Sequence, residues 1–278
     1  MARVTAFCLL IGLFLPSALA AGETSAAVQV PLYAPRYFPF QNGEKAVYHA
    51  SWNGIPVGSA EVQTRRLSIE GKPFFAVRVD ARTSRVLDLV WKMRDTISSV
   101  FDARSLAPSR YVFNQRENQR VIDTDARYDP VAKKWSVDRR QKGKKPRIYE
   151  FDGPNTLDPI SAVYLARSVD FKVGDRLLFH VFGGRYRYLL ELTVERREPV
   201  AVGNRAVEAF RIVPKVTNLT KKGYAGRLNE ATIWISADER RIPVKLTSRI
   251  FVGSVEMELA EGETGLRPTA TAAAGRPG

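Results

Sequence analysis

Cysteine and histidine are scarce in this chain, and their scarcity excludes several classes of protein. The 278 residues include one cysteine, Cys8, and two histidines, His49 and His180. A single thiol cannot form a disulfide framework or a thiolate zinc site, and two histidines are too few for a multi-histidine metal centre. The remaining composition, 45% hydrophobic and 26% charged, is typical of a globular protein. The sequence therefore predicts a folded protein without a metal or another cofactor.

Long hydrophobic runs are also lacking beyond the N-terminus. Arg3 is followed by an apolar run over residues 6–15, and Ala18-Leu19-Ala20 provides the small-x-small pattern of a signal-peptidase site. The run is too short to cross a bilayer core of about 30 Å as a helix. Residues 1–20 are therefore predicted to be a signal peptide that is cleaved near Ala20, which places the protein in the periplasm. An uncleaved anchor helix is the alternative.

The rest of the chain divides into three parts. Residues 21–39 contain several prolines and small residues, which indicates an extended lead-in. Residues 262–278 have no apolar periodicity and are expected to be disordered. No linker interrupts residues 40–261, which we expect to form a single domain.

Alternation of apolar and polar residues dominates that predicted domain. Val255, Met257 and Leu259, for example, alternate with Glu256 and Glu258. A period of two is typical of strands with one buried and one solvated face. Short turn signals separate the alternating segments, as in antiparallel hairpins. The sequence therefore predicts a mostly β fold: a single strongly curved or wrapped antiparallel sheet of about a dozen strands, like an incomplete barrel.

One segment departs from the strand period. Asp158 followed by Pro159 is a typical helix start, because an N-cap acceptor precedes a residue that is preset for the first turn. Apolar residues follow at helical spacing, which predicts a short amphipathic helix over residues 158–168. We expect this helix to plug the concave face or one mouth of the sheet. A second helical turn is predicted over residues 84–90.

Catalytic motifs are absent from the sequence. It contains no GxSxG elbow, no phosphate-binding loop and no glycine-rich dinucleotide turn. His180 alternates with Leu178 and Phe182 and is expected to face the same side as they do, so both histidines are interpreted as structural. We predict no catalytic residue, although paired carboxylates stay open because Asp and Glu are plentiful.

Positive charge is concentrated in one short segment of a chain whose net charge is +14. Eight cationic side chains lie close together with one acid, Asp138: Lys133, Lys134, Arg139, Arg140, Lys142, Lys144, Lys145 and Arg147. Gly143 and Pro146 predict a hairpin tip in the densest part. Such a patch indicates an anionic partner. Because the predicted export argues against nucleic acid, we expect an anionic lipid or another envelope component. The alternative is a hairpin whose charges serve solubility.

Three stretches resemble a bacterial envelope family catalogued as domain of unknown function 3108. They lie at residues 38–62, 156–167 and 231–246. The residues that carry the resemblance are Tyr48, Trp52, Gly54, Gly58, Asp158, Pro159, Tyr164, Arg167, Trp234, Asp238 and Pro243. Their types indicate structural roles, such as turns, a helix cap and buried strands. More loosely, the terminal strand–turn–strand is similar to that of outer-membrane lipoprotein carriers, which implies an incomplete barrel around acyl chains.

Together these patterns favour a periplasmic, non-catalytic binding or scaffolding protein of the cell envelope. The concave face of the sheet would hold a lipid or another hydrophobic ligand, unless the helix over residues 158–168 fills it. Two alternatives stay open. One is an envelope hydrolase that acts through carboxylates. The other is an integral outer-membrane barrel, whose required apolar outer band would be interrupted at Arg65-Arg66.

Overall fold

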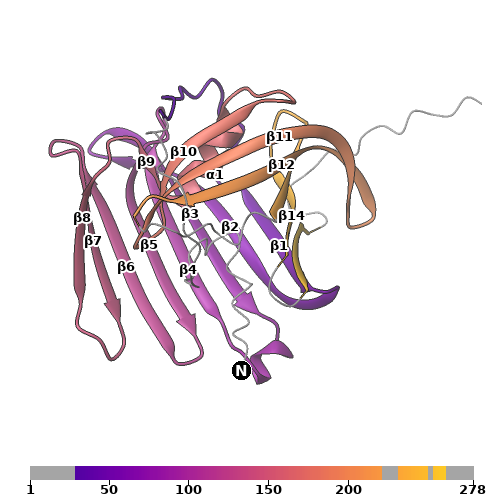
Figure 1. Ribbon diagram of the computed structural model, residues 1–278, viewed down its shortest axis with the longest axis horizontal. Helices are drawn as coiled ribbons and strands as arrows, with labels where there is room; N and C mark the ends of the chain where they lie inside the picture. Colours follow the sequence, from indigo (N-terminus) through magenta and orange to yellow (C-terminus); the bar gives the residue numbers. More distant parts are fainter. Residues whose placement is uncertain (1–28, 221–230, 250–252, 261–278) are drawn as a thin grey trace, which may run out of the picture.

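A single large sheet dominates the computed structural model, which describes residues 29–220, 231–249 and 253–260 (Figure 1). This part of the chain also contains one α-helix, α1 (Pro159–Ser168), and one short 3-10 helix, η1 (Leu87–Leu89). The fifteen strands are β1 (Lys45–Trp52), β2 (Ile55–Ile69), β3 (Lys72–Thr83), β4 (Arg94–Asp102), β5 (Pro108–Glu117), β6 (Arg120–Asp129), β7 (Lys134–Gln141), β8 (Arg147–Asp152), β9 (Thr156–Leu157), β10 (Arg176–Phe182), β11 (Arg187–Val202), β12 (Arg205–Asn218), β13 (Ala231–Ser236), β14 (Pro243–Arg249) and β15 (Ser254–Leu259).

Strand order follows the chain with one exception. From one edge to the other the order is β8-β7-β6-β5-β4-β3-β2-β1-β15-β14-β13-β12-β11-β10-β9. Sequence neighbours therefore pair along both halves, and the antiparallel pairing of β1 with β15 joins the halves. The pairing of β9 with β10 is parallel and covers two residue pairs. The predicted mostly β, single-sheet architecture is confirmed.

The two edge strands, β8 and β9, are consecutive in the chain, so the sheet curves round almost to its own beginning. No backbone ladder joins β8 to β9 or β10 in the described residues. Side chains fill this gap instead: the ring centroids of Phe151 and Phe182 lie 5.0 Å apart, and those of Trp135 and Phe182 lie 5.9 Å apart. The Arg187 guanidinium lies 5.5 Å from the Phe151 ring centroid. The barrel is therefore closed by aromatic packing and stays open in its hydrogen bonding.

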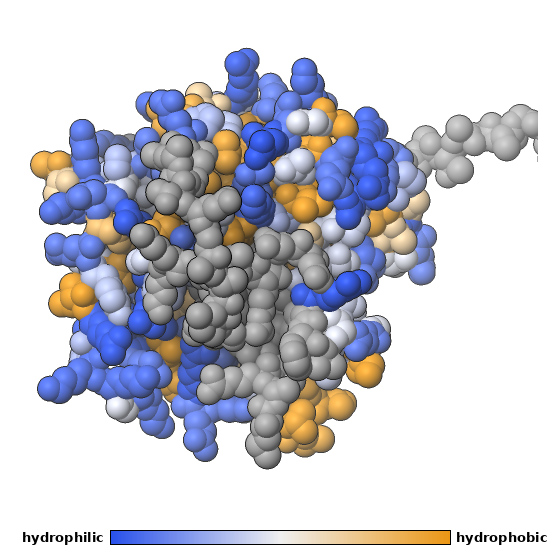
Figure 2. Space-filling view, viewed as in Figure 1, coloured by the Kyte–Doolittle hydropathy of each residue, from blue (hydrophilic) through white to orange (hydrophobic). Residues whose placement is uncertain are grey.

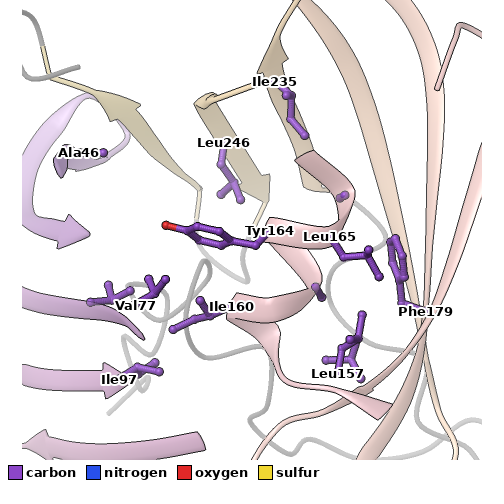
Figure 3. Packing of buried hydrophobic residues seen from close by; sticks show 14 of the residues in the cluster. Ala46, Val77, Ile97, Leu157, Ile160, Tyr164, Leu165, Phe179, Ile235 and Leu246 are labelled. Atoms are coloured by element: carbon purple, nitrogen blue, oxygen red, sulfur yellow. The ribbon is translucent and has the colours of Figure 1, made fainter. Parts of the chain in front are cut away.

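Helix α1 fills the interior of this sheet. Its N-cap is Asp158, whose side chain accepts hydrogen bonds from the Ile160 and Ser161 backbone N–H groups, and a reciprocal bond from the Asp158 N–H to the Ser161 hydroxyl completes a capping box. Figure 3 shows Tyr164 and Ile160 facing the strands that carry Ala46, Val77 and Ile97, while Leu165 faces Phe179 on the opposite side. The helix is thus packed on both sides, which agrees with its prediction as a plug.

The differences from the sequence-based expectations concern detail. Fifteen strands exceed the expected dozen, partly because β9, with two residues, is too short to show a period. The second predicted helical turn, residues 84–90, contains η1. Residues 29–39, the described part of the predicted lead-in, contain no strand or helix. The predicted signal peptide and C-terminal tail lie outside the described residues.

Candidate binding site

Four residues from distant parts of the chain meet in a polar cluster inside the sheet. The Arg167 guanidinium, on α1, donates from Nη1 to Glu44 Oε1 at 2.9 Å and from Nη2 to Glu44 Oε2 at 3.4 Å. The Tyr48 hydroxyl donates to the Pro243 carbonyl oxygen at 2.9 Å. Three of these, Tyr48, Arg167 and Pro243, are predicted motif residues. The cluster therefore ties α1 to both halves of the sheet and gives those motif residues a structural role.

Arg167 is the centre of the cluster. Only 4% of its side chain and 14% of that of Glu44 are exposed. Its guanidinium lies 5.4 Å from the ring centroid of Phe40 and 5.2 Å from that of Tyr164, so two aromatic faces also contact the cation. The Tyr164 hydroxyl in turn lies 2.5 Å from the Thr64 hydroxyl. Burial raises the pKa of Tyr164, with opposition from Arg167, so the phenol stays protonated.

A cavity of about 70 Å³ lies beside this cluster. Arg167 and Glu44 border it at one side, and the rest of its wall is mostly aliphatic: Ala46, Ala60, Val62, Val77, Val79, Ile160 and Val163. A space of this size holds a few water molecules. It is too small for a lipid chain, because α1 occupies the concave face of the sheet. The sequence had left open whether a ligand or this helix fills that face.

The remaining motif residues are spread over the fold. Gly54 has a φ of +81° in the β1–β2 turn, a conformation that favours glycine. Gly58 lies opposite Ala50 at a bulge between β1 and β2. The Trp234 indole N–H donates to Glu198 Oε1 at 2.9 Å, and Asp238 accepts from the Ser236 hydroxyl in the β13–β14 turn. Trp52 packs partly buried against the main core.

A second, larger cavity of about 500 Å³ lies between α1, the lead-in and the rim of the sheet that carries the β4–β5 and β6–β7 turns. We call it the cleft. Residues of the lead-in, Val30–Pro35, cover one side of it. The Leu178 backbone N–H donates to the Tyr33 hydroxyl at 3.0 Å, and the Tyr33 ring centroid lies 5.2 Å from that of Phe179. The cleft is therefore covered by a segment that the Tyr33 side chain ties to β10, and the adjoining Arg36 backbone N–H donates to the Ser168 carbonyl at 3.0 Å.

The wall of the cleft is apolar and aromatic, with few charged groups. Leu157, Leu165, Phe179, Tyr128 and Trp135 line its inner part. A cavity of several hundred cubic ångströms with such a wall has the size and chemistry of a small-molecule site. The Trp135 side chain is buried, and its Nε1 has no hydrogen-bond partner in the described part of the chain.

One arginine and one histidine border the cleft, and no carboxylate does so among the described residues. Arg104 lies exposed at the rim. His180 is partly buried, and desolvation, helped by the nearby Arg187, lowers its pKa, so His180 is uncharged at neutral pH. The sequence-based interpretation treated His180 as structural. Its place in the cleft could not be predicted, because the lead-in that forms the opposite wall has no periodic signal.

Six of the eight cationic residues of the predicted basic segment lie at the two ends of β7, and Arg139 and Arg140 lie within the strand. Lys133 precedes the strand and Lys134 begins it, on the same rim as the cleft, whereas Lys142, Lys144 and Lys145 lie at the β7–β8 turn on the opposite rim. Gly143 has a φ of +76° there, which confirms the hairpin tip. Arg147 begins β8 at the same turn.

Two of the arginines are engaged along β7 itself. Arg139 is partly buried, its Nη1 donates to the Thr124 hydroxyl at 3.0 Å, and desolvation, followed by the charge of Arg120, lowers its pKa. Arg140 forms an ion pair with Asp138 at 2.7 Å. The freely exposed charge is therefore smaller than the sequence count and sits mainly at the turn.

Other kinds of site have little support in the described residues. No three His, Cys, Asp or Glu side chains gather there in a way that could hold a metal ion. Within the same ranges, no helix has the length and hydropathy needed to cross a membrane. The buried carboxylates Asp95, Glu117 and Asp158 line neither cavity, and Asp158 is used as the helix cap.

The fold and its site define the class of protein: a β-barrel-like sheet wrapped round one helix, with an apolar cleft at one rim. The family model described as "Protein of unknown function (DUF3108)" matches residues 47–260, and the chain belongs to this family. A crystal structure of a β-barrel-like protein of domain of unknown function DUF1849 from Brucella abortus is similar, with a TM-score of 0.49 and 12% identity over 79% of this chain and 96% of that one. A search of the curated proteins finds no match.

Proposed function

We propose that the protein is an exported, non-catalytic binding protein of the cell envelope that holds an amphiphilic ligand in the cleft. The observation that carries the proposal is the cleft itself: about 500 Å³ of mainly apolar and aromatic wall with a cation at its rim. The apolar wall suits an acyl chain, and Arg104 suits an anionic or polar head group. The absence of a carboxylate from the described lining argues against the alternative of a hydrolase that acts through paired carboxylates.

The anionic partner of the predicted basic segment belongs to the same proposal. Lys142, Lys144 and Lys145 lie exposed at the β7–β8 turn, and none of them forms an ion pair within the described ranges. Their rim faces away from the cleft rim. The protein would thus hold its ligand at one end while the other end contacts an anionic component of the envelope.

A cleft-filling substitution tests the ligand site. Ala107 borders the cleft and is exposed, so Ala107→Trp is expected to fill part of the space without disturbing the core. If the indole displaces about two methylene groups of the acyl chain, at about 0.8 kcal/mol each, the affinity for palmitate should fall by roughly tenfold in isothermal titration calorimetry. Ala132→Trp is the matched control, because Ala132 is exposed on the β6–β7 turn of the same rim but does not line the cleft.

Two further results would decide the nature of the ligand. Arg104→Gln should weaken palmitate binding and leave hexadecanol binding unchanged, since only the carboxylate needs the cation. Mass spectrometry of organic extracts from the natively purified protein should detect a bound amphiphile. If neither palmitate nor hexadecanol binds and the extract contains no lipid, the cleft is not a lipid site.

Export makes a separate prediction. The protein recovered from the periplasmic fraction is expected to begin at Ala21 or one residue to either side, because Ala18-Leu19-Ala20 satisfies signal peptidase after a short apolar run. The intact mass of the purified protein measures this directly. Recovery of the chain with Met1 in a membrane pellet would instead indicate an uncleaved anchor.

A further inference from the structure

The connection between β3 and β4 exposes three bulky apolar side chains at its tip. Residues 84–93 join the two strands and include η1. Val86 is 77% exposed, Leu89 86% and Val90 77%. We call these three residues the apolar tip. Single exposed apolar residues are common on protein surfaces, but three within five positions of one protruding turn require an explanation.

The structure of the connection holds this tip in place. Leu87 packs against the main core, and the Ser84 backbone N–H donates to the Val57 carbonyl at 2.8 Å. Asp88 forms an ion pair with Arg94 at 2.5 Å and accepts a hydrogen bond from the Thr83 hydroxyl. The hydrogen bonds from Arg94 and then Thr83 lower the pKa of Asp88 to about 2, so the one acid of the turn stays ionised and paired. The apolar tip is therefore presented on a fixed support, with its local negative charge compensated.

The apolar tip shares its rim with the basic β7–β8 turn. The Asn118 backbone N–H donates to the Lys92 carbonyl at 2.8 Å, which joins the β5–β6 turn to the connection that carries the tip. The Lys142 N–H donates to the Val121 carbonyl at 2.9 Å, which joins the β7–β8 turn to the start of β6. Figure 1 places these turns along the lower edge of the sheet.

Further side chains give this rim a mixed apolar and cationic character. Arg85 and Lys92 are exposed on either side of the apolar tip, and Ile55, which begins β2 at the same rim, is exposed as well. Figure 2, in the same view, shows hydrophobic side chains at the lower edge of the molecule beside hydrophilic ones. The whole set lies on the rim opposite the cleft.

We propose that this rim docks on an anionic phospholipid bilayer, with Val86, Leu89 and Val90 inserted between the lipids and the surrounding lysines and Arg85 against the head groups. The inference makes the anionic partner of the proposed function a membrane surface, and it rests on that part of the proposal. Apolar side chains flanked by cations match a bilayer interface, because the apolar groups can enter the acyl region while the cations contact the phosphates of the head groups. A second copy of the chain is a poorer occupant, because stable protein interfaces bury over 1,000 Å² and three side chains at a narrow tip cannot provide that area.

The first test measures sedimentation with vesicles of 30% phosphatidylglycerol and 70% phosphatidylcholine. The double variant Leu89→Ser/Val90→Ser is expected to bind about tenfold more weakly than the parent, and the loss should persist at 0.5 M salt because it is hydrophobic in origin. The triple variant Lys142→Gln/Lys144→Gln/Lys145→Gln should lose binding at low salt. Val131→Ser is the matched control: Val131 is 91% exposed, but it lies in the β6–β7 turn on the opposite rim. All variants keep the same N-terminus, so any difference in vesicle binding comes from the substituted residues.

The second test places a reporter at the apolar tip. Cys8 is the chain's one cysteine, so Leu89→Cys in a Cys8→Ser background can be labelled with a single environment-sensitive fluorophore. Its emission should shift to the blue with the anionic vesicles and should not shift with phosphatidylcholine alone. The same label at Val131→Cys should not respond to either.

The outcomes separate the inference from the proposed function. If the lysine variant loses binding but the apolar variant does not, the rim contacts anions without insertion, and the inference is wrong while the anionic partner stands. If the parent sediments neither with the anionic vesicles nor with phosphatidylcholine alone, the docking inference and the anionic partner of the proposed function are both wrong. The ligand site is unaffected by that result, because palmitate binding in the cleft is measured independently. If the parent is a dimer in light scattering and Leu89→Ser/Val90→Ser is a monomer, the tip contacts a second copy instead of a bilayer. Unchanged thermal unfolding of the variants shows that the exposed substitutions leave the fold intact.

Discussion

Replacement of Arg167 by alanine is expected to lower the free energy of unfolding by about 3–5 kcal/mol, which is the usual cost of breaking a buried ion pair by removing one partner. The substitution leaves the Glu44 carboxylate in the interior without its cation and also removes the contacts with Phe40 and Tyr164. Urea unfolding followed by far-UV circular dichroism measures the change.

A surface ion pair gives the matched control for this prediction. Arg176 pairs with Glu191 at 2.5 Å, but 60% of its side chain is exposed, so Arg176→Ala should cost less than about 1 kcal/mol. The double variant Glu44→Met/Arg167→Met should be more stable than Arg167→Ala, because no unpaired charge is left inside. Equal, small effects of Arg167→Ala and Arg176→Ala would show that the interior pair is solvated.

Removal of the helix cap is the second large effect. Asp158 is fully buried and accepts hydrogen bonds from the Ser99 hydroxyl, at 2.6 Å, and from the Ile160 and Ser161 N–H groups. Asp158→Ala leaves these donors without an acceptor, and each unsatisfied buried donor costs about 1–3 kcal/mol. A loss of about 3 kcal/mol or more is therefore expected, again by urea unfolding. Asp158→Asn keeps an acceptor oxygen for the N–H groups and should lose much less.

Asp158 also predicts a pH dependence. Burial raises the pKa of its carboxyl above the ordinary value of 3.8, although the hydrogen bond from Ser99 and those of the cap oppose the change. A carboxyl with a raised pKa holds its proton more tightly in the folded state, so its contribution to stability falls as the pH rises from about 4 through the raised pKa. The stability difference between the parent and Asp158→Asn should shift against the parent over that range. A difference that is flat from pH 4 to 7 would mean that burial is offset by the hydrogen bonds.

Local signals made the helix and most strands predictable. The helix start at Asp158-Pro159 is stabilised by hydrogen bonds between residues at most three positions apart, so the local sequence is enough to predict it. Val255, Met257 and Leu259 are buried as their alternation predicts, because β15 has one face against the core. β9 has two residues and no period that could reveal it.

Long-range geometry explains what the sequence could not provide. The partner of Arg167 is Glu44, far away in the chain, and only the wrapping of the sheet brings the two together. The basic segment reads as one patch, but a strand rises about 3.3 Å per residue, so β7 carries Lys134 and Lys142 to opposite rims. The cleft depends on the lead-in, whose position follows from the contact of Tyr33 with β10.

The pairing of β1 with β15 has a consequence for the order in which the chain can fold. All other antiparallel pairs join strands that are adjacent in sequence, so each hairpin can form as soon as its own residues are available. Tyr48 lies opposite Leu259, so this one contact closes a loop that includes almost the whole domain. A polypeptide that is threaded through a membrane pore with its N-terminus first cannot complete the sheet until its last strand has crossed. If the chain is exported as proposed, β1 therefore stays without its β15 partner until the last strand has crossed.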